Sequence, residues 1–314
     1  MRLFFTTDIH GSERCFRKLV NAAKAYRADA LVLGGDITGK VLVPLVSEPD
    51  GRVSASVFGQ PRYAQGEQET AELERTLRQS GCYTIRITRE QKSAIDEDQS
   101  AIERLFRQAV TETVQAWMTL ARERLECDGI PLYMSAGNDD EPYVDDVLAQ
   151  DEYVRAPEGK IVELPDGREM ISIGFSNITP FGTPRELSED ELEDRMDRLA
   201  GALREPERAV FNFHCPPYGT SLDSAAKLDP NLRPILDGAN VVMAPAGSRA
   251  TKTVIERFQP LLGLHGHIHE SRAAQKLGRT MCFNPGSEYS EGVLRGVLME
   301  VGPKKLKGWQ FTTG

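Results

Sequence analysis

The sequence is poor in cysteine and in long apolar runs. Its five cysteines, at positions 15, 82, 127, 215 and 282, are odd in number and widely spaced, and none forms a Cys-x-x-Cys pair. This argues against a disulfide framework and a structural zinc knot, and favours free thiols in a reducing compartment. No run approaches the roughly 18 apolar residues of a transmembrane helix. The opening Leu3-Phe4-Phe5 is too short for a signal peptide. We therefore expect a cytoplasmic protein that does not associate with membranes.

Positive charge is also in short supply. The chain has 38 lysines and arginines against 47 acidic residues, which gives a formal net charge of −9. An acidic surface argues against general attraction to nucleic acid or to anionic membranes. It still allows a nucleotide-like ligand, because a bound metal can outweigh the surrounding charge. With 314 residues, 40% of them hydrophobic, the chain can bury a large core, and we expect residues 1–314 to form a single α/β domain.

Histidine is scarce, and its placement is informative. Three of the five histidines lie within the stretch Gly263–Glu270, and all five follow the end of an apolar run: His10, His214, His265, His267 and His269. Histidine is the commonest metal ligand in proteins, and its neutral ring suits borderline transition metals. The pattern therefore predicts a metal site.

The apolar runs predict an α/β order. Residues 1–7 and 30–33 read as buried strands, and the helix between them is expected to be capped by Ser12. Further strands are expected at 130–134, 209–213 and 260–264, a hairpin at 161–175, helices capped by Ser188 and Ser248, and antiparallel strands from residue 280. Polar groups follow each strand of the core. In open α/β sheets, sites lie outside the carboxyl ends of strands.

Residues 41–128 differ in character from the rest and read as an insertion. A hairpin is expected over 41–46 and 53–58, around a Pro-Asp-Gly turn, followed by helices at about 67–80 and 96–126. The second helix carries an apolar stripe from Ile102 to Leu120. The stripe predicts packing on the main body. A cap over the site, or a face for homo-oligomers, is the alternative.

Seven side chains at the strand ends are candidate metal ligands: Asp8, His10, Asp36, Asn138, His214, His267 and His269. Residues two apart on an extended segment project the same way, so Asp8 with His10, and His267 with His269, can each enter one cavity. Carboxylate, imidazole and amide oxygen suit Mn, Fe, Zn, Co or Ni. Seven ligands are too many for one ion but suit two ions that share a carboxylate. Two ions about 3.5–4 Å apart stabilise both oxygens of a phosphoryl transfer.

The order of these blocks resembles the calcineurin-like metallophosphoesterases over about residues 1–40 and 130–290. The matching blocks are Asp8-Ile9-His10, Gly35-Asp36-Ile37-Thr38-Gly39, Gly137-Asn138-Asp139-Asp140, His214 and Gly266-His267-Ile268-His269. The segments 214–220 and 284–287 further resemble a small prokaryotic branch, the Icc-related phosphoesterases. The resemblance implies a four-layer αββα sandwich, classed as α/β (α+β), with a mostly helical insertion at 41–128.

The resemblance also assigns the ligands. It implies a first metal on Asp8, His10, Asp36 and His269. It implies a second on Asp36, Asn138, His214 and His267, with Asp36 and a water as bridges. Asn138 would also contact a phosphate oxygen. Asp140 is expected to be a supporting or helix-start residue rather than a ligand.

One position departs from the family pattern. Asp139 stands where many members have a histidine that protonates the leaving group or steadies the phosphate. A carboxylate needs a raised pKa to act as an acid, and two nearby dications lower it. His265 can substitute for the histidine or can be a packed residue. A nucleophile–base pair of Cys215 and His214 is disfavoured, because neighbours on a strand point in opposite directions.

The sequence therefore predicts a phosphoric ester hydrolase with two divalent metal ions, Mn²⁺ first among them. Its substrate is expected to be a small, nucleotide-like phosphodiester or monoester, attacked in line by a metal-activated water. Asp36, Asn138, Asp139 and His265 are the predicted catalytic residues. The alternatives are a metal-stabilised scaffold or binding protein with little catalysis, and a protein phosphatase.

Overall fold

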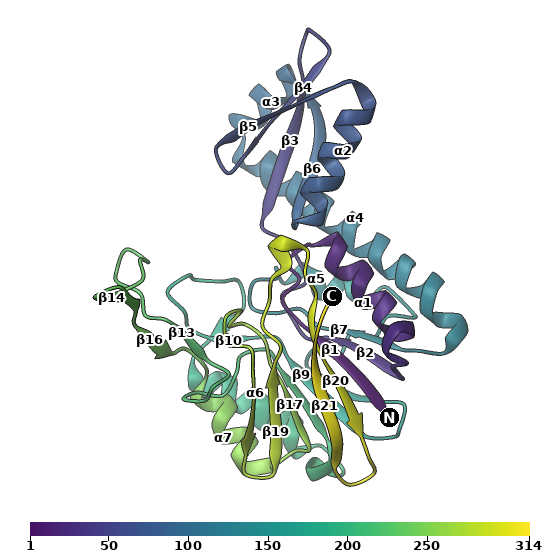
Figure 1. Ribbon diagram of the computed structural model, residues 1–314, viewed down its shortest axis with the longest axis vertical. Helices are drawn as coiled ribbons and strands as arrows, with labels where there is room; N and C mark the ends of the chain where they lie inside the picture. Colours follow the sequence, from purple (N-terminus) through teal and green to yellow (C-terminus); the bar gives the residue numbers. More distant parts are fainter.

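The computed structural model describes residues 1–314. Two β-sheets face each other at the centre of the main body (Figure 1). The first sheet has the order β21-β20-β1-β2-β7. Its strands are β1 (Arg2–Thr6), β2 (Ala30–Leu33), β7 (Leu132–Met134), β20 (Arg295–Val301) and β21 (Leu306–Thr313). The second has the order β18-β19-β17-β12-β9-β8. Its strands are β8 (Ile161–Glu163), β9 (Glu169–Ile173), β12 (Val210–Phe213), β17 (Leu262–Leu264), β18 (Ala273–Leu277) and β19 (Thr280–Asn284).

Helices cover the outer face of each sheet. The first sheet is covered by α1 (Glu13–Tyr26), α4 (Gln99–Leu125) and α5 (Tyr143–Leu148), and the second by α6 (Glu189–Gly201) and α7 (Arg249–Phe258). One core cluster fills each helix–sheet interface, and a third, with Phe5, Val210 and Leu264, fills the space between the sheets. The predicted four-layer αββα sandwich is therefore confirmed.

Strand direction places the site at one edge of both sheets. The central strands β1, β2 and β7 run parallel to one another, as do β9, β12, β17 and β19. These strands are almost fully buried on both faces, which explains their continuous apolar sequences. The predicted strands from residue 280 are β19, β20 and β21. The antiparallel expectation holds for β20 with β21, whereas β19 lies in the other sheet, antiparallel to β18 and parallel to β17.

The three helix caps expected from serine are present. The hydroxyl oxygens of Ser12, Ser188 and Ser248 accept hydrogen bonds from the backbone three residues on. Ser188 also forms the expected capping box with Glu191. The Ser12 cap sets the direction of α1 directly after the first pair of candidate ligands.

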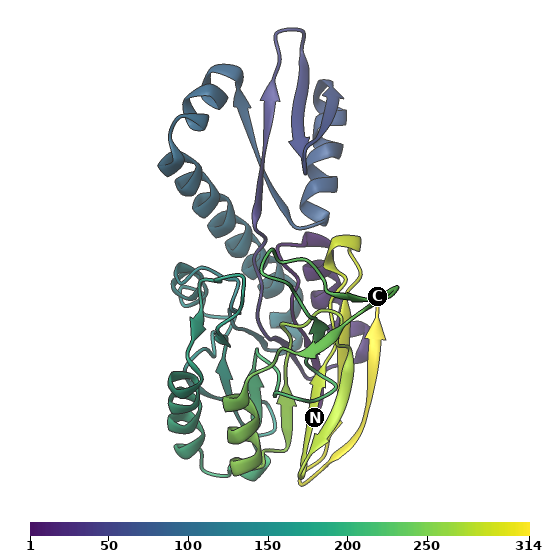
Figure 2. The ribbon, with the colours of Figure 1, turned by 90° about the vertical axis from the view of Figure 1, so that its left-hand side faces the viewer.

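Residues 41–98 form a separate lobe above the body (Figures 1 and 2). It holds a four-stranded sheet of order β5-β4-β3-β6, with strands β3 (Val41–Ser47), β4 (Arg52–Val57), β5 (Gln60–Gln65) and β6 (Cys82–Thr88). The helices α2 (Gly66–Gln79) and α3 (Arg89–Asp96) lie on opposite sides of the sheet (Figure 2). The expected hairpin is β3–β4. The elements β5, β6 and α3 were not predicted from the sequence. For β6 the reason is its pairing along the whole of β3, some forty positions away.

Helix α4 joins the lobe to the body. Its apolar stripe enters the body core, where Trp117 stacks on Phe16 with ring centroids 4.6 Å apart. The prediction that this helix packs on the main body is thus confirmed. No helix in the chain combines the length and the apolar character needed to cross a membrane.

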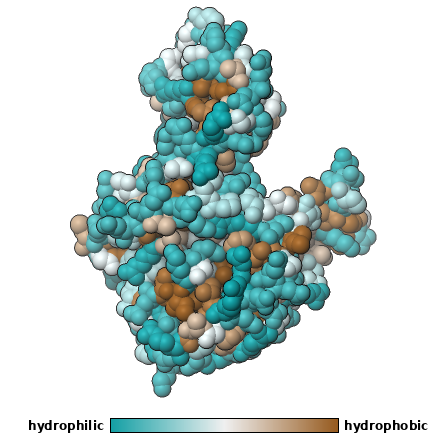
Figure 3. All heavy atoms as spheres, turned by 180° about the vertical axis from the view of Figure 1, so that it is seen from behind, coloured by the Kyte–Doolittle hydropathy of each residue, from teal (hydrophilic) through white to brown (hydrophobic).

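A second projection lies beside the body, formed by short antiparallel ribbons. They are β13 (Ser224–Ala226) with β16 (Met243–Pro245), and β14 (Leu236–Asp237) with β15 (Asn240–Val241). Four large apolar side chains are exposed on it: Leu232, Leu236, Val241 and Met243. In Figure 3 this arm shows brown apolar residues at the side of a mostly hydrophilic surface. A further short pair, β10 (Ser176–Asn177) and β11 (Glu186–Leu187), lies near the loop that follows β7.

Candidate metal centre

The loops that follow five central strands meet at one edge of the sandwich. Those after β1, β2 and β7 come from the first sheet, and those after β12 and β17 from the second. The backbone holds them together. The Asp8 amide donates to the Gly35 carbonyl (3.0 Å), and the Gly266 amide donates to the His214 carbonyl (2.9 Å). All seven candidate ligands are joined by close side-chain contacts at this edge, although the positions furthest apart differ by more than 250 in sequence.

Four of the seven form a compact group. Asp8, His10, Asp36 and His269 each offer one ligand atom, and these atoms all lie within 4.8 Å of one another. His10 Nε2 is 3.0 Å from His269 Nε2, and His269 Nε2 is 3.4 Å from Asp8 Oδ1. Ligand atoms about 2.1 Å from one tetrahedral zinc-like ion would be about 3.4 Å apart, so the group fits a transition-metal ion. These are the four residues that the sequence analysis grouped around a first metal.

The other three candidate ligands lie beside this group. His214 Nε2 is 3.3 Å from Asp36 Oδ2, and the Nδ1 atom of His267 is 2.7 Å from Asn138 Oδ1. The opposite ring nitrogen of His214 faces the Gly34 carbonyl at 3.2 Å, so Nδ1–H donates there and Nε2 is directed at the carboxylates. His214 Nε2 is buried and has no hydrogen-bond partner. A buried, unpartnered imidazole nitrogen beside a carboxylate matches the donor set of a metal site.

The buried carboxylates of the ligand cluster favour a positive charge beside them. Burial raises the pKa of Asp36, but the charges of His214 and His10 outweigh this and lower the pKa well below its usual range. Burial lowers the pKa of His214, but the carboxylates of Asp36 and Asp8 dominate and raise it to about 10. The carboxylates therefore remain ionised and draw a proton onto His214. A divalent ion would supply the same positive charge.

The backbone is strained at the same residues. Asp8, His10, Asp36 and His267 have φ angles of 53°, 39°, 49° and 67°, and they are half of the non-glycine residues with positive φ in the chain. Such conformations cost about 1–3 kcal/mol each and concentrate at functional sites. Neighbouring hydrogen bonds maintain them: the His267 amide donates to Asp8 Oδ1 at 3.0 Å.

Two glycines make the close approach of the loops possible. A Cβ atom at Gly137 would lie 2.2 Å from Asp36 Oδ1, and one at Gly35 would lie 2.2 Å from His214 Nδ1. Gly35 also has a φ of 132°, which side-chain-bearing residues rarely adopt. The glycines of the sequence blocks thus leave room for the ligands beside them.

Asp140 braces the loops and does not reach the cluster of ligands. Its carboxylate accepts hydrogen bonds from the amides of Ile37 (2.9 Å), Thr38 (2.8 Å) and Gly137 (2.7 Å). These bonds tie the loop after β2 to the loop after β7. The supporting role expected for Asp140 is what the structure shows.

Asn284 and Ser287 support the loops that carry the ligands. The loop after β17, which carries His267 and His269, is called the histidine loop below. The Asn284 amide nitrogen donates to the carbonyls of Gly266 (3.2 Å) and Ile268 (3.0 Å), and the Ser287 hydroxyl donates to the Asp8 carbonyl (2.6 Å). Both lie in the segment 284–287, which the sequence analysis matched to a family block without assigning it a role. Its link to the ligands is a product of the tertiary structure.

Two supporting residues have no sequence signal of their own. Arg185 is fully buried, and its Nε donates to the Asp140 carbonyl at 2.9 Å. The Thr183 hydroxyl oxygen accepts from Asn138 Nδ2 at 3.0 Å and donates to Glu186 Oε1 at 2.8 Å. Thr183 therefore orients the Asn138 amide so that its oxygen points towards His267. Neither residue lies in a recognisable motif, so only the folded chain identifies them.

The two remaining predicted catalytic residues lie in different surroundings. The Asp139 carboxylate is at the rim, 4.0 Å from His10 Nδ1, and its amide donates to Asp36 Oδ1 at 2.9 Å. His265 is fully buried, and its Nδ1 lies 2.7 Å from the Phe213 carbonyl. No hydrogen bond or ion pair joins the His265 ring to any candidate ligand. Burial lowers the pKa of His265 to about 4, so the ring is neutral. These surroundings match the second of the two roles considered for His265, that of a packed residue.

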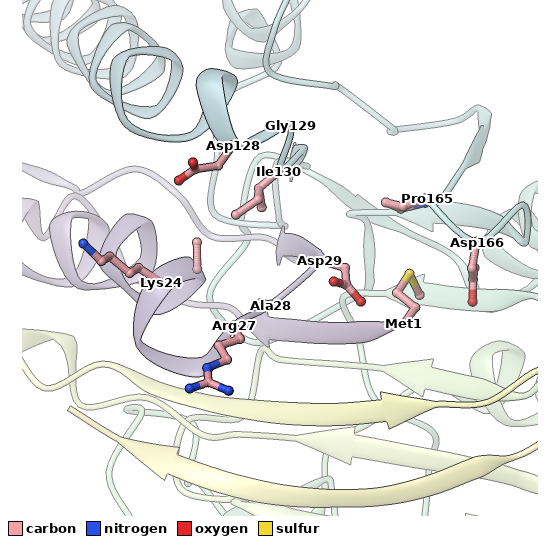
Figure 4. A pocket seen from close by; sticks show the side chains of 11 residues that line it. Met1, Lys24, Arg27, Ala28, Asp29, Asp128, Gly129, Ile130, Pro165 and Asp166 are labelled. Carbon is pink, nitrogen blue, oxygen red and sulfur yellow. The ribbon is translucent and has the colours of Figure 1, made fainter.

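Cys215 has no part in a nucleophile–base pair. Its thiol points to the Asn177 side-chain oxygen at 3.0 Å, and burial raises the pKa of the thiol. A surface cavity of about 830 Å³ is also unrelated to the cluster of ligands. Met1, Asp29 and Gly129 are among its lining residues (Figure 4), and they lie at the starts of strands, on the opposite edge of the sheets.

Known proteins share this architecture at low sequence identity. No protein-family model matches the chain. A 117-residue segment is 32% identical to the uncharacterized protein MJ1162 of Methanocaldococcus jannaschii, and it covers 37% of this chain and 46% of that relative. The match thus spans less than half of the relative's length. The solved structure of TT1561 from Thermus thermophilus aligns over 100% of this chain and 97% of its own, with a TM-score of 0.56 and 14% identity.

A dimetal phosphatase from Danio rerio also aligns over 100% of this chain and 98% of its own, with a TM-score of 0.44 and 9% identity. At a TM-score of 0.56, the alignment with TT1561 shows a shared fold over the whole chain. The family resemblance stated from the sequence is supported at the level of this fold. At identities this low, the substrate and the roles of single residues must be argued from the geometry of the site.

Proposed function

We propose that the protein is a hydrolase of phosphoric esters that works with two divalent metal ions. The observation that carries this proposal is the gathering of seven candidate ligand side chains at one edge of the sandwich, where the buried Nε2 of His214 lies 3.3 Å from Asp36 Oδ2 without a hydrogen-bond partner. A purely structural role would not explain why two carboxylates and four imidazoles are gathered where burial penalises charge.

The ligand atoms divide into two sets that share Asp36. Asp8, His10, Asp36 and His269 would hold one ion. Asp36, Asn138, His214 and His267 would hold the other. Two bound ions would polarise a phosphoryl group, lower the pKa of an attacking water and stabilise the charge that develops in an in-line displacement.

The chain's own residues prepare the site for that chemistry. Asp140, Asn284 and Ser287 fix the loops, so that the ligands are in place before substrate arrives. Most ligand side chains are at most 6% exposed, whereas His269 is 35% exposed, so substrate would enter from the side of His269. His265 acts in this proposal as a packed residue that holds the strand before the histidine loop.

The substrate is proposed to be a small phosphodiester or an activated monoester, nucleotide-like compounds included. Mn²⁺ is the first choice of metal, with Fe, Zn, Co and Ni as alternatives that the same ligands accept. The five unpaired cysteines support a reducing cytoplasm as the place of action.

The test is metal content per chain together with hydrolysis of bis-p-nitrophenyl phosphate and p-nitrophenyl phosphate. The protein is stripped with chelator and reloaded with each metal in turn. Two ions per chain and turnover are the expected result. Two ions without turnover on any ester would favour a metal-stabilised scaffold, and no binding after loading would overturn the proposal.

A further inference from the structure

Lys40 reaches from the base of the lobe back to the rim of the ligand cluster. Its Nζ lies 2.5 Å from Asp139 Oδ2. The lysine side chain is 56% exposed, whereas that of Asp139 is 14% exposed, so the ammonium lies on the solvent side of the pair. No other acidic group is within ion-pair distance of Lys40, and its ammonium makes no hydrogen bond elsewhere. Asp139 thus determines where the ammonium lies.

Asp139 is itself held in place by two candidate ligands. Its amide donates to Asp36 Oδ1 at 2.9 Å, and its Oδ2 lies 4.0 Å from the His10 ring. The carboxylate is therefore fixed between the ligands and the lysine. The ammonium of Lys40 thus pairs with a carboxylate that lies beside the ligand His10.

We propose that Lys40 is a substrate-binding residue whose ammonium donates a hydrogen bond to a phosphate oxygen, and that Asp139 is its positioning residue. This inference rests on the proposed function. An ammonium has three N–H donors, so pairing with the Asp139 carboxylate leaves donors for a phosphate oxygen at the rim. Lysine binds phosphate as a point charge. The Lys40–Asp139 pair thus occupies the place where the family pattern has a histidine.

The stability of the fold does not explain why a lysine stands at position 40. Exposed ion pairs contribute little to folding, about 0–1 kcal/mol. Without Lys40, the Asp139 carboxylate would present negative charge to an incoming anionic ester. With Lys40, the rim is neutral, and an ammonium faces the substrate.

The experiment measures binding of inorganic phosphate to the full-length, metal-loaded protein by calorimetry, alongside kcat and KM for bis-p-nitrophenyl phosphate. Lys40→Met is expected to weaken phosphate binding by about 10–100-fold, the loss of one charge-assisted hydrogen bond. Lys40→Arg should remain within a few-fold of wild type. Metal content is measured in every variant, so that loss of phosphate binding is separated from loss of metal.

The matched control is Lys92→Met. It breaks a lysine–aspartate pair that lies within the lobe, between Lys92 and Asp96 on α3. It should bind phosphate as wild type does. Asp139→Asn should weaken phosphate binding less than Lys40→Met, because the lysine stays but loses its anchor.

Two results would overturn the inference. One is phosphate binding by Lys40→Met within threefold of wild type. The other is an Asp139→Asn variant that loses more turnover than Lys40→Met on esters with poor leaving groups, since that would make Asp139 the acid. Wild-type hydrolysis with either result leaves the proposed function standing. Wild-type protein with two metals but neither hydrolysis nor phosphate binding removes both proposals.

Discussion

The body and the lobe place their charged residues in opposite ways. In the body, Asp8, Asp36 and His214 are at most 2% exposed, and they lie where five strands end. In the lobe, charged pairs such as Arg86 with Glu67 lie on the surface, over a core cluster of five buried residues. Exposed pairs contribute about 0–1 kcal/mol, whereas buried charge is strongly unfavourable unless it is paired or bound to a metal. The comparison places the candidate metal site in the body, with Lys40 between this site and the lobe.

The largest effect is expected from removing the shared carboxylate. Asp36→Asn should reduce turnover by more than about 100-fold and weaken the binding of both metals. Asp36 is the ligand that the two proposed sets share, and even supporting residues can change metal affinity 10–100-fold. Metal analysis after dialysis and ester hydrolysis measure the result. Full metal occupancy with full activity in this variant would contradict the assignment of the site to the body.

Matched core substitutions test whether the lobe is independent of the site. Leu45→Ala in the lobe and Leu264→Ala before the histidine loop each remove a fully buried leucine side chain. Each should cost about 2–5 kcal/mol of local stability. The first should speed hydrogen exchange in β3 and β6 and leave metal content unchanged. The second should reduce both the melting temperature of the body and its metal content. Equal metal loss in the two variants would show that lobe and site fold as one unit.

A smaller effect is expected from a residue that acts through Asn138. Thr183→Val removes the hydroxyl that bonds the Asn138 amide and should weaken metal binding by about 10-fold. Thr183→Ser keeps the hydroxyl and should bind metal as wild type does. Competition with a chelator gives the affinities. A valine variant equal to the serine variant would show that Asn138 needs no such support.

The smallest effect concerns the pH dependence of stability. Burial lowers the pKa of His265 to about 4, against about 6.5 in an unfolded chain. Its contribution to the free energy of unfolding is therefore fully present above pH 6.5 and is lost as the pH falls towards 4. In the metal-free protein, His265→Gln should flatten this fall by up to about 1.4 kcal/mol per pH unit. Urea unfolding of both proteins between pH 4 and 7 provides the measurement, and parallel pH profiles would show that the His265 ring is accessible to protons.

Local sequence was enough to predict the elements that are stabilised locally. The caps at Ser12, Ser188 and Ser248 depend on neighbours three residues away, and the β3–β4 hairpin on its Pro-Asp-Gly turn. The buried central strands could be predicted because burial on both faces demands continuous apolar runs. The candidate ligands were found for the same reason, since polar residues directly after such runs stand out.

Only the tertiary structure decided which residues act together. The sequence by itself determined the types of the candidate ligands, their order and the four-layer fold. The ligands stand directly after apolar runs, and the fold follows from the order of the blocks that resemble a known family. The strand β6, the support of Asn138 by Thr183 and the bracing by Arg185 depend on partners about 40 or more positions away. The pairing of Lys40 with Asp139 spans the whole lobe. No local pattern encodes such contacts, because they exist only when the loops of both sheets meet at one edge.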